Sequence, residues 1–315
     1  MSGKFAQIGY IEETTYGENP GAVTRFVPLV NESLTQDIAR MESEGIIAGQ
    51  HLIRSEQWAP GRRTIEGDVG HEWFQQNMAL LFKHMLGSMT SSFSGGVGTH
   101  TITPGNLTGK SLTVQVGKPT VSGTVIPFTY HGVKVRSWSL SVVAEQIATL
   151  GLSLIAQSET NGIALAAASY GTDAAKPYTY IQGGVTISGS DVCVRELNLE
   201  GENNLSDERI CIGQGEIDEP VQMDLTEITG TATMEFTSTQ QYQRFLDGDE
   251  LSMVLSMSAS ASAQAEITMN VRYDGITPEV PGRDLVVTEI PIKVIGTSTD
   301  AGGFTAVLKT AQSEL

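Results

Sequence analysis

The feature that most constrains this chain is an internal repeat. Short segments of the first half return in the second half, in the same order and with similar gaps. The paired segments are 46–50 and 210–214 (IIAGQ, ICIGQ), 65–67 and 228–230 (IEG, ITG), 133–135 and 292–294 (VKV, IKV), and 156–159 and 311–314 (AQSE in both). Because chance identities rarely keep their order, we interpret the chain as two homologous halves, 1–159 and 160–315. A duplicated chain predicts an assembly in which one polypeptide fills two equivalent positions.

The composition favours strands. The chain has 315 residues, enough for two domains of about 150 residues each. Hydrophobic residues make up 40% and charged residues 17%, and much of the remainder is Ser, Thr and Gly, which is typical of strands and turns. Alternating or apolar runs predict strands at 111–116, 133–143, 150–156, 192–199, 230–236, 251–257, 265–272 and 290–295.

Each half contains one predicted helix at the corresponding place. In the first half, a helix at 73–86 carries an apolar stripe that we interpret as core, and Gly87 ends it. The stripe consists of Phe74, Met78, Leu81, Phe82 and Met85. In the second half, residues 238–241 have the form of a capping box, and Gly248 ends a shorter helix. One helix on strands, twice over, predicts a mainly β chain of two tandem sandwich-type or barrel-type domains.

The segment 40–63 lacks a steady period and mixes apolar residues with charges and Gly. Long loops of this kind either wrap their own domain or dock on a neighbour, and both alternatives stay open on the residues alone. The candidate contact residues are Ile46, Ile47, Leu52, Ile53 and Trp58.

The charge is unevenly distributed. Residues 1–159 hold 11 Lys and Arg against 13 Asp and Glu, a net of −2, and residues 160–315 hold 8 against 23, a net of −15. An acidic surface keeps a protein soluble and repels nucleic acid. With no run of ~18 apolar residues and no secretory signal, we expect a soluble protein made in the cytoplasm. Cys193 and Cys211 lie in apolar alternating segments and are expected to be buried thiols, with a disulfide as the alternative.

No motif predicts catalysis, a cofactor or a metal. Residues 105–111 resemble a phosphate loop, but only three residues separate the glycines, so we interpret them as a turn. The five histidines are far apart without metal-ligand spacing, and His84 is expected at the surface. The acidic clusters 216–219 and 247–250 are interpreted as solvated turns.

The opening segment is the most distinctive. Residues 9–21 contain EETTYG followed by a Pro, and an apolar strand then leads to an ESL step at Glu32-Ser33-Leu34. This segment resembles the start of tail tube (major tail) proteins of long, non-contractile-tailed bacteriophages, the siphophage type. The resemblance continues through 40–63, the strand at 65–67 and the helix at 73–86, and resumes at Asn203-Asn204-Leu205 and around Gly230. Residues 88–130 show none.

The resemblance implies a non-enzymatic virion protein. Such subunits are β-sandwiches with a flanking helix, and they form rings that stack around a tape measure protein into a tube that the genome later crosses. It further implies terminator and distal tail proteins as partners, a long loop contacting the next ring, and DNA passing without specific binding or any membrane. Six-fold rings and two domains per chain predict three chains per ring, with a hexamer as the alternative. A carbohydrate-binding or adhesin-like β-sandwich and a sheet-rich hydrolase are the rival hypotheses.

Overall fold

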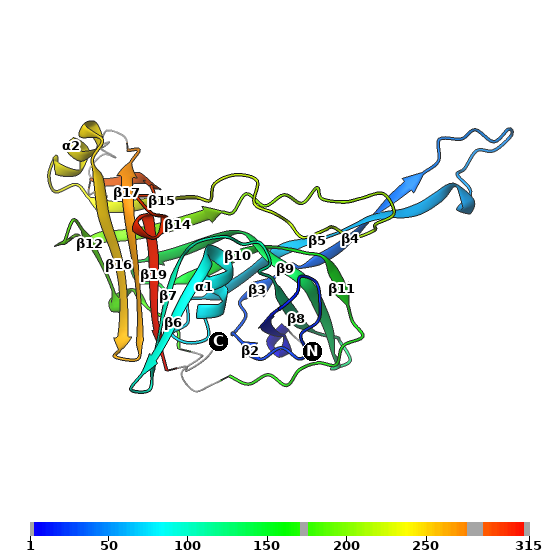
Figure 1. The fold of residues 1–315 in the computed structure, drawn as a ribbon, viewed down its shortest axis with the longest axis horizontal. Coiled ribbons are helices and arrows are strands. Elements are labelled where there is room, and N and C mark those ends of the chain that lie inside the picture. Colours follow the sequence, from blue (N-terminus) through cyan, green and yellow to red (C-terminus); the bar gives the residue numbers. More distant parts are fainter. Residues whose placement is uncertain (1–2, 171–175, 276–285, 312–315) are drawn as a thin grey trace.

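The computed structural model describes residues 3–170, 176–275 and 286–311. The chain is mainly β, as the sequence predicts (Figure 1). The first-half strands are β1 Gln7–Glu12, β2 Arg25–Phe26, β3 Asn31–Glu32, β4 Thr35–Glu42, β5 Trp58–Glu72, β6 Gly87–Ser94, β7 Val97–Pro104, β8 Leu112–Pro119, β9 Val125–Val143 and β10 Thr149–Ala156. The later strands are β11 Ser158–Thr160, β12 Gly183–Ile187, β13 Ser190–Asp191, β14 Val194–Glu202, β15 Glu227–Glu235, β16 Glu250–Ser260, β17 Ala263–Tyr273, β18 Val287–Val294 and β19 Phe304–Thr310. The α-helices are α1 Ala79–Leu86, α2 Gln240–Asp247 and α3 Asp300–Gly303.

One antiparallel sheet runs through both halves. Its order is β4–β5–β10–β9–β14–β15–β18–β17–β16–β12. The β9–β14 pairing, in which Leu140 lies opposite Leu199, joins the two halves edge to edge. A second junction pairs β7 with β19, where Ile102 lies opposite Ala306. Since backbone hydrogen bonds cross from one half to the other, β9 and β14 cover each other's edges.

Strand β9 belongs to two layers. Its C-terminal part lies in the main sheet, and its N-terminal part pairs with β8 and β11, while β8 pairs with β1. The buried side chains of both layers, including Tyr10, Tyr130 and Trp138, belong to one hydrophobic cluster. Helix α1 packs on β6, β7 and β9 inside this arrangement (Figure 1). Two sheet layers closed by a helix are the expected way to bury strands that are apolar on one side.

Helix α1 is shorter than the predicted 73–86. Trp73 and Phe74 remain in extended backbone, because the Trp73 amide donates to the Ala148 carbonyl and Phe74 forms a β-bridge with Pro177. The helix runs from Ala79 to Leu86 and is followed by Gly87, whose φ of 104° lies in the left-handed region. The Gly87 amide donates to the Lys83 carbonyl, a glycine cap of the kind the sequence predicts.

The two helices differ in burial. Seven of the eight α1 residues are buried, whereas no α2 residue is. Helix α2 also ends at a glycine in the left-handed region, Gly248, with a φ of 67°. Within the described residues, each of these helices follows a long strand and precedes a hairpin, β6–β7 after α1 and β16–β17 after α2.

The segment 40–63 is not the loop that the sequence predicts. Strand β4 continues to Glu42 and β5 begins at Trp58, and these two residues lie opposite each other in a hairpin. Only residues 43–57 connect the strands, including a short 3-10 helix at Ser55–Gln57. We call residues 40–63 the arm, which projects far beyond the rest of the sheet in Figure 1. The two strands of the arm pair through their backbones although apolar and polar residues do not alternate along them. The sequence of the arm therefore shows no strand period.

Two further expectations, on His84 and on the two cysteines, are wrong. His84 is only 2% exposed, because α1 turns it toward the Glu12 side chain instead of solvent. Cys193 and Cys211 are both exposed free thiols, because Cys193 lies in the connection between β13 and β14 and Cys211 in the loop between β14 and β15.

Among the described residues, no helix has the length and apolar character that crossing a membrane would require.

Candidate functional site

One face of the main sheet forms a continuous surface across both halves of the chain. Residues directly opposite each other in antiparallel strands share a face, so the strand register defines this surface. Three rows cross five strands in the order β5, β10, β9, β14, β15. The rows are Glu72–Thr149–Ser141–Asn198–Thr231, Gly70–Gly151–Ser139–Glu200–Thr229 and Asp68–Ser153–Ser137–Glu202–Glu227. We call these fifteen residues the polar face; each is exposed or half-exposed.

The opposite side of the same strands is apolar. Leu150 lies opposite Leu140, which lies opposite Leu199, and all three are buried. Strict alternation between a buried and a solvated side is what positions the polar face. A slip of one residue in any of these pairings would exchange the two sides, so the apolar core fixes which residues point outward.

The polar face carries acidic charge and small side chains. Its charged residues are Asp68, Glu72, Glu200, Glu202 and Glu227, and its other members are Ser, Thr, Gly and Asn. At its border Lys293 lies opposite Thr229, and its Nζ contacts the Glu227 carboxylate. The fifteen residues include no lysine or arginine, and the bordering Lys293 is paired with Glu227.

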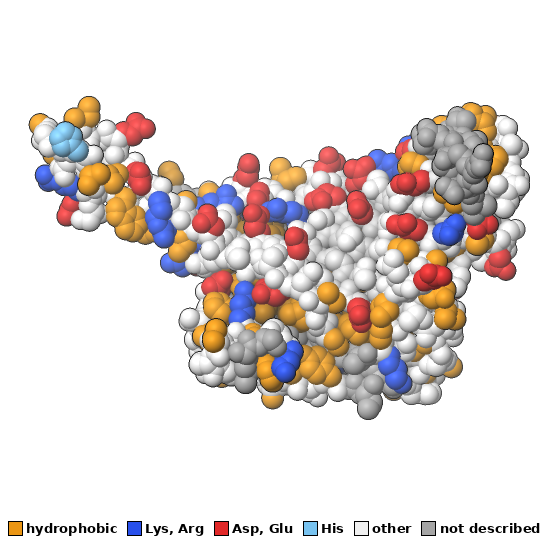
Figure 2. Space-filling view, turned by 180° about the vertical axis from the view of Figure 1, so that it is seen from behind, with side chains coloured by type: hydrophobic (Ala, Val, Ile, Leu, Met, Phe, Trp, Pro, Cys, Tyr) orange, Lys and Arg blue, Asp and Glu red, His pale blue; other side chains and the backbone are white. Residues whose placement is uncertain are grey.

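The polar face is hollowed. A broad open groove is lined by residues of all five strands, among them Asp68, Ser139, Gly151 and Glu200. Glycines contribute to the hollow, since a Cβ at Gly151 would meet the Ser139 Oγ at 2.6 Å. Figure 2 shows acidic side chains spread over the molecule between the arm and the second half.

The predicted contact residues all lie on the arm. Ile46 is 98% and Leu52 82% exposed, Ile53 and Trp58 are about half-exposed, and Ile47 is partly covered. The Arg40 guanidinium lies over the Trp58 ring, 5.6 Å from its centroid. A group of large apolar side chains held in water is unfavourable for an isolated chain and typical of a contact surface.

The predicted core residues Phe74, Met78, Leu81, Phe82 and Met85 are all buried. The Phe82 ring stacks on Trp73 with centroids 5.7 Å apart, and Tyr178 meets Trp73 edge-on. Phe74 and Met78 precede α1 in the chain and are buried as well.

The two glutamates of the EETTYG segment have structural partners. The buried Glu13 carboxylate accepts hydrogen bonds from the hydroxyls of Ser111 at 2.5 Å and Thr113 at 2.7 Å, and from the amides of Gly17 and Gly132. It therefore holds the 13–17 turn against β8 and β9. These hydrogen bonds replace the ones that the carboxylate would make to water, so its burial is not unfavourable.

Glu12 fastens β1 to α1. Its carboxylate lies 2.6 Å from the Lys83 Nζ and 3.6 Å from the His84 Nε2. Contact with His84, followed by Lys83, lowers the pKa of Glu12 to about 2. Burial lowers the pKa of His84, so this imidazole is held neutral.

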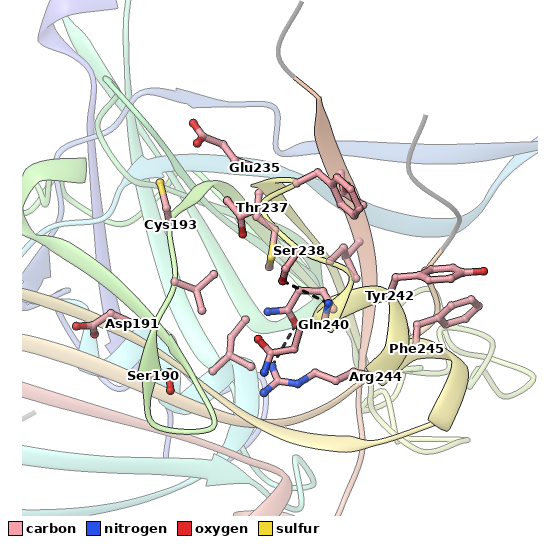
Figure 3. A pocket seen from close by; sticks show the side chains of 18 residues that line it. Ser190, Asp191, Cys193, Glu235, Thr237, Ser238, Gln240, Tyr242, Arg244 and Phe245 are labelled. Carbon is pink, nitrogen blue, oxygen red and sulfur yellow. Dashed lines mark hydrogen bonds between the residues drawn. The ribbon is translucent and has the colours of Figure 1, made fainter. Parts of the chain in front are cut away.

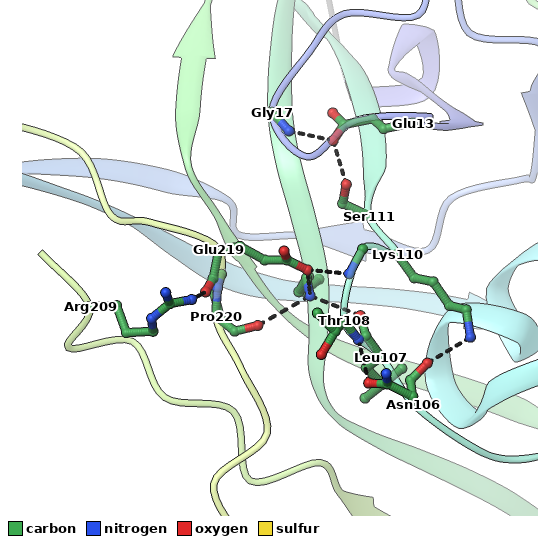
Figure 4. Close-up of polar contacts among 12 residues, drawn as sticks. Glu13, Gly17, Asn106, Leu107, Thr108, Lys110, Ser111, Arg209, Glu219 and Pro220 are labelled. Carbon is green, nitrogen blue, oxygen red and sulfur yellow. Dashed lines mark hydrogen bonds and ion pairs between the residues drawn. The ribbon is translucent and has the colours of Figure 1, made fainter.

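A buried lysine ties the long β14–β15 loop, residues 203–226, to the first half (Figure 4). The Lys134 Nζ donates to Glu219 at 2.5 Å and to the Leu107 and Pro220 carbonyls. Burial lowers the pKa of Lys134, and the Glu219 carboxylate opposes that shift. The Gly109 amide also donates to Glu219, so the phosphate-loop-like segment 105–111 binds a carboxylate of its own chain.

A pocket lies beneath α2 (Figure 3). Tyr242 and Phe245 from the helix line it together with Ile187, Met234 and Ile290 from the sheet. Arg244 reaches back to the Gln241 side chain at 3.1 Å. Among the described residues that line this pocket are Ser190, Ser238, Cys193 and Asp191 but no histidine, so the set that a Ser or Cys hydrolase would need is not assembled there.

The described residues also contain no group of three or more His, Cys, Asp or Glu placed to hold a metal ion. Two histidines have neutral partners. His71 contacts the Tyr10 hydroxyl and the Pro28 carbonyl, and His100 contacts Ser91 and Thr310. The fold and its surfaces thus define a mainly β protein whose extended features are a sheet face and an arm.

Comparison with known proteins identifies the family. A family model described as phage tail tube protein matches residues 3–296, nearly the whole chain. The chain belongs to this family and is a structural component of a bacteriophage tail, which self-assembles into a tube. No curated protein matches the chain.

Proposed function

We propose that this chain builds a ring whose channel is lined by the polar face. The observation that carries the proposal is the continuity of that face across both halves, from β5 to β15. Because Ser, Thr and Gly are small, the polar face would protrude little into the channel, and its carboxylates repel the phosphates of DNA. A genome could then pass through the tube without being held.

The ring is proposed to contain three chains. The halves 1–159 and 160–315 are treated as repeats, since each contains a hairpin, a helix and a second hairpin in the same order. Strand β14 lies four places from β4 in the sheet, and β15 lies four places from β5. Three chains of two repeats would give a pseudo-six-fold ring, with a hexamer of chains as the alternative.

Rings are proposed to stack through the arm around a tape measure protein, in the virion of a phage with a long, non-contractile tail. The exposed Ile46, Leu52 and Trp58 support this role, because stacking would remove their side chains from water. Terminator and distal tail proteins would close the two ends. The protein would be made in the host cytoplasm and would have no catalytic activity.

The arm can be tested by mutation. Replacing Ile46, Ile47 and Trp58 with Ser or Asp should block tube formation and leave the chain folded. Circular dichroism would check the fold, and negative-stain electron microscopy would check for rings and tubes. Normal tubes from this variant would refute the role of the arm.

The channel wall can be tested by thiol labelling. In a background with Cys193→Ser and Cys211→Ser, the substitution Ser139→Cys places one thiol on the polar face. In assembled tubes this thiol should react with a small maleimide and not with a maleimide on a large polymer, while the unassembled chain should react with both. Equal reaction of the tube with both reagents would show that the polar face is not enclosed.

The carbohydrate-binding hypothesis gains no support. Among the described residues, the aromatic side chains that are more than 40% exposed are Phe5, Trp58, Phe93, Tyr170, Tyr180 and Phe236, and they come from separate segments of the chain. A glycan site would instead require aromatic side chains gathered on one surface.

A further inference from the structure

The arm tip has a structural counterpart in the second half. In residues 46–50 the Gln50 amide donates to the Ile47 carbonyl at 3.1 Å, and Gly49 has a φ of 75°. In residues 210–214 the Gln214 amide donates to the Cys211 carbonyl at 3.1 Å, and Gly213 has a φ of 95°. Both are four-residue turns with a glycine in the left-handed region at the third position, as type II turns require. We call these segments the arm turn and the second turn.

Both turns lie at the same end of the strands of the main sheet. The arm turn connects β4 to β5 and the second turn lies in the connection of β14 to β15. Four successive antiparallel pairings separate β4 from β14, so these two strands run in the same direction. Figure 1 shows the arm and the β14–β15 loop extending toward the same side, away from α2.

The second turn presents apolar side chains to solvent. Ile212 is fully exposed and Ile210 is 37% exposed, and Met223 and Leu225 of the same loop are 72% and 83% exposed. The loop that carries them is held in place. The Arg63 amide donates to the Gly215 carbonyl at 2.8 Å, Arg63 pairs with Glu216 at 3.3 Å, and Lys134 holds Glu219.

The opposite end of the same strands carries an apolar cluster of its own. The β9–β10 connection and the 3-10 helix Tyr180–Gln182 lie together there, since the Tyr180 amide donates to the Gln146 carbonyl. Ile147, Tyr180 and Ile181 are 39%, 41% and 78% exposed. We call these three residues the edge cluster.

We propose that the second turn is a docking element of the same kind as the arm turn, and that its partner is the edge cluster of another copy of this chain. This inference rests on the proposed stacking of rings. The family to which the chain belongs self-assembles into a tube, so the partner of an exposed apolar turn is a second copy of the same chain. The apolar turns lie at one end of the strands and the apolar cluster at the other end. A contact between them joins copies head to tail and propagates along one axis.

The first test is a substitution in the second turn. Ile212→Asp should raise the protein concentration needed for half-maximal tube formation by about ten-fold or more, as expected for loss of one apolar contact residue. Ile212→Val is the matched control and should form tubes like the wild type. Melting curves of the unassembled chains should coincide, because Ile212 has no buried surface to lose.

The second test is cross-linking with the natural Cys211 as one partner. In a Cys193→Ser background, Ile181→Cys should give cross-links between chains in assembled tubes with a short bis-maleimide. Val121→Cys, at an exposed position on the β8–β9 turn outside the edge cluster, should give none.

Each result decides something. Reduced tube formation by Ile212→Asp together with the 181–211 cross-link supports the inference. Normal tubes from Ile212→Asp, or tubes that give no 181–211 cross-link, overturn it and leave the arm and the channel wall as proposed. If the wild-type chain forms neither rings nor tubes even with other tail components, the proposed function fails and the inference fails with it.

Discussion

The sharpest prediction concerns His71, whose imidazole is 1% exposed inside the first half. Its Nδ1 lies 2.8 Å from the Pro28 carbonyl oxygen, which can only accept, so Nδ1 carries the proton. Its Nε2 lies 2.7 Å from the Tyr10 hydroxyl, which then donates to it. The neutral ring is therefore satisfied on both nitrogens, and burial lowers the pKa of His71 to about 4.

The stability effect follows from the two pKa values. Between pH 6.5 and about 4 the unfolded chain binds a proton at His71 and the folded chain does not. The free energy of unfolding is thus fully retained above pH 6.5 and falls as the pH is lowered through this window. At ~1.4 kcal/mol for each pH unit, His71 accounts for a loss of about 3 kcal/mol.

The variant His71→Gln isolates this contribution. Glutamine can donate to Pro28 and accept from Tyr10 but does not titrate, so the wild type should lose its advantage over the variant between pH 6.5 and 4. Urea unfolding of the unassembled chains at several pH values measures the difference. His51→Gln, on the exposed arm, is the matched control and should follow the wild type. Parallel pH curves for wild type and His71→Gln would refute the reasoning.

Three other perturbations test the packing. Phe82→Ala should reduce the free energy of unfolding by about 3–5 kcal/mol, because the buried ring leaves a cavity beside Trp73; an unchanged melting temperature would show that the ring contributes nothing. Gly87→Ala should destabilise far more than Gly215→Ala, since a Cβ at Gly87 would lie 2.3 Å from the Gly105 oxygen and one at Gly215 meets nothing; equal melting temperatures would contradict this. Glu219→Gln should speed hydrogen exchange in residues 203–226 and leave β16–β17 unchanged, because it weakens the hold of Lys134; unchanged exchange in the loop would refute that role.

The sequence predicted the strands well where one side of a strand is buried. The alternation at 150–156 corresponds to β10, in which Leu150, Leu152 and Leu154 are buried and the intervening residues are not. It failed at the arm, where β4 has no buried residue and therefore no period. It also failed for His84 and Cys211, because one residue on a helix or in a loop carries no information about what packs beside it.

What the sequence by itself determined is the mainly β class, the two glycine-terminated helices and the turn signals, all of which depend on neighbours close along the chain. Only the tertiary structure decided that β9 pairs with β14 and joins the halves, so that Ser139 and Glu200 share one surface. Strand pairing between distant segments depends on the fit of whole apolar sides, and local patterns do not encode which strands meet. The polar face results from that pairing. The same pairing places the two turns at one end of the strands and the edge cluster at the other end.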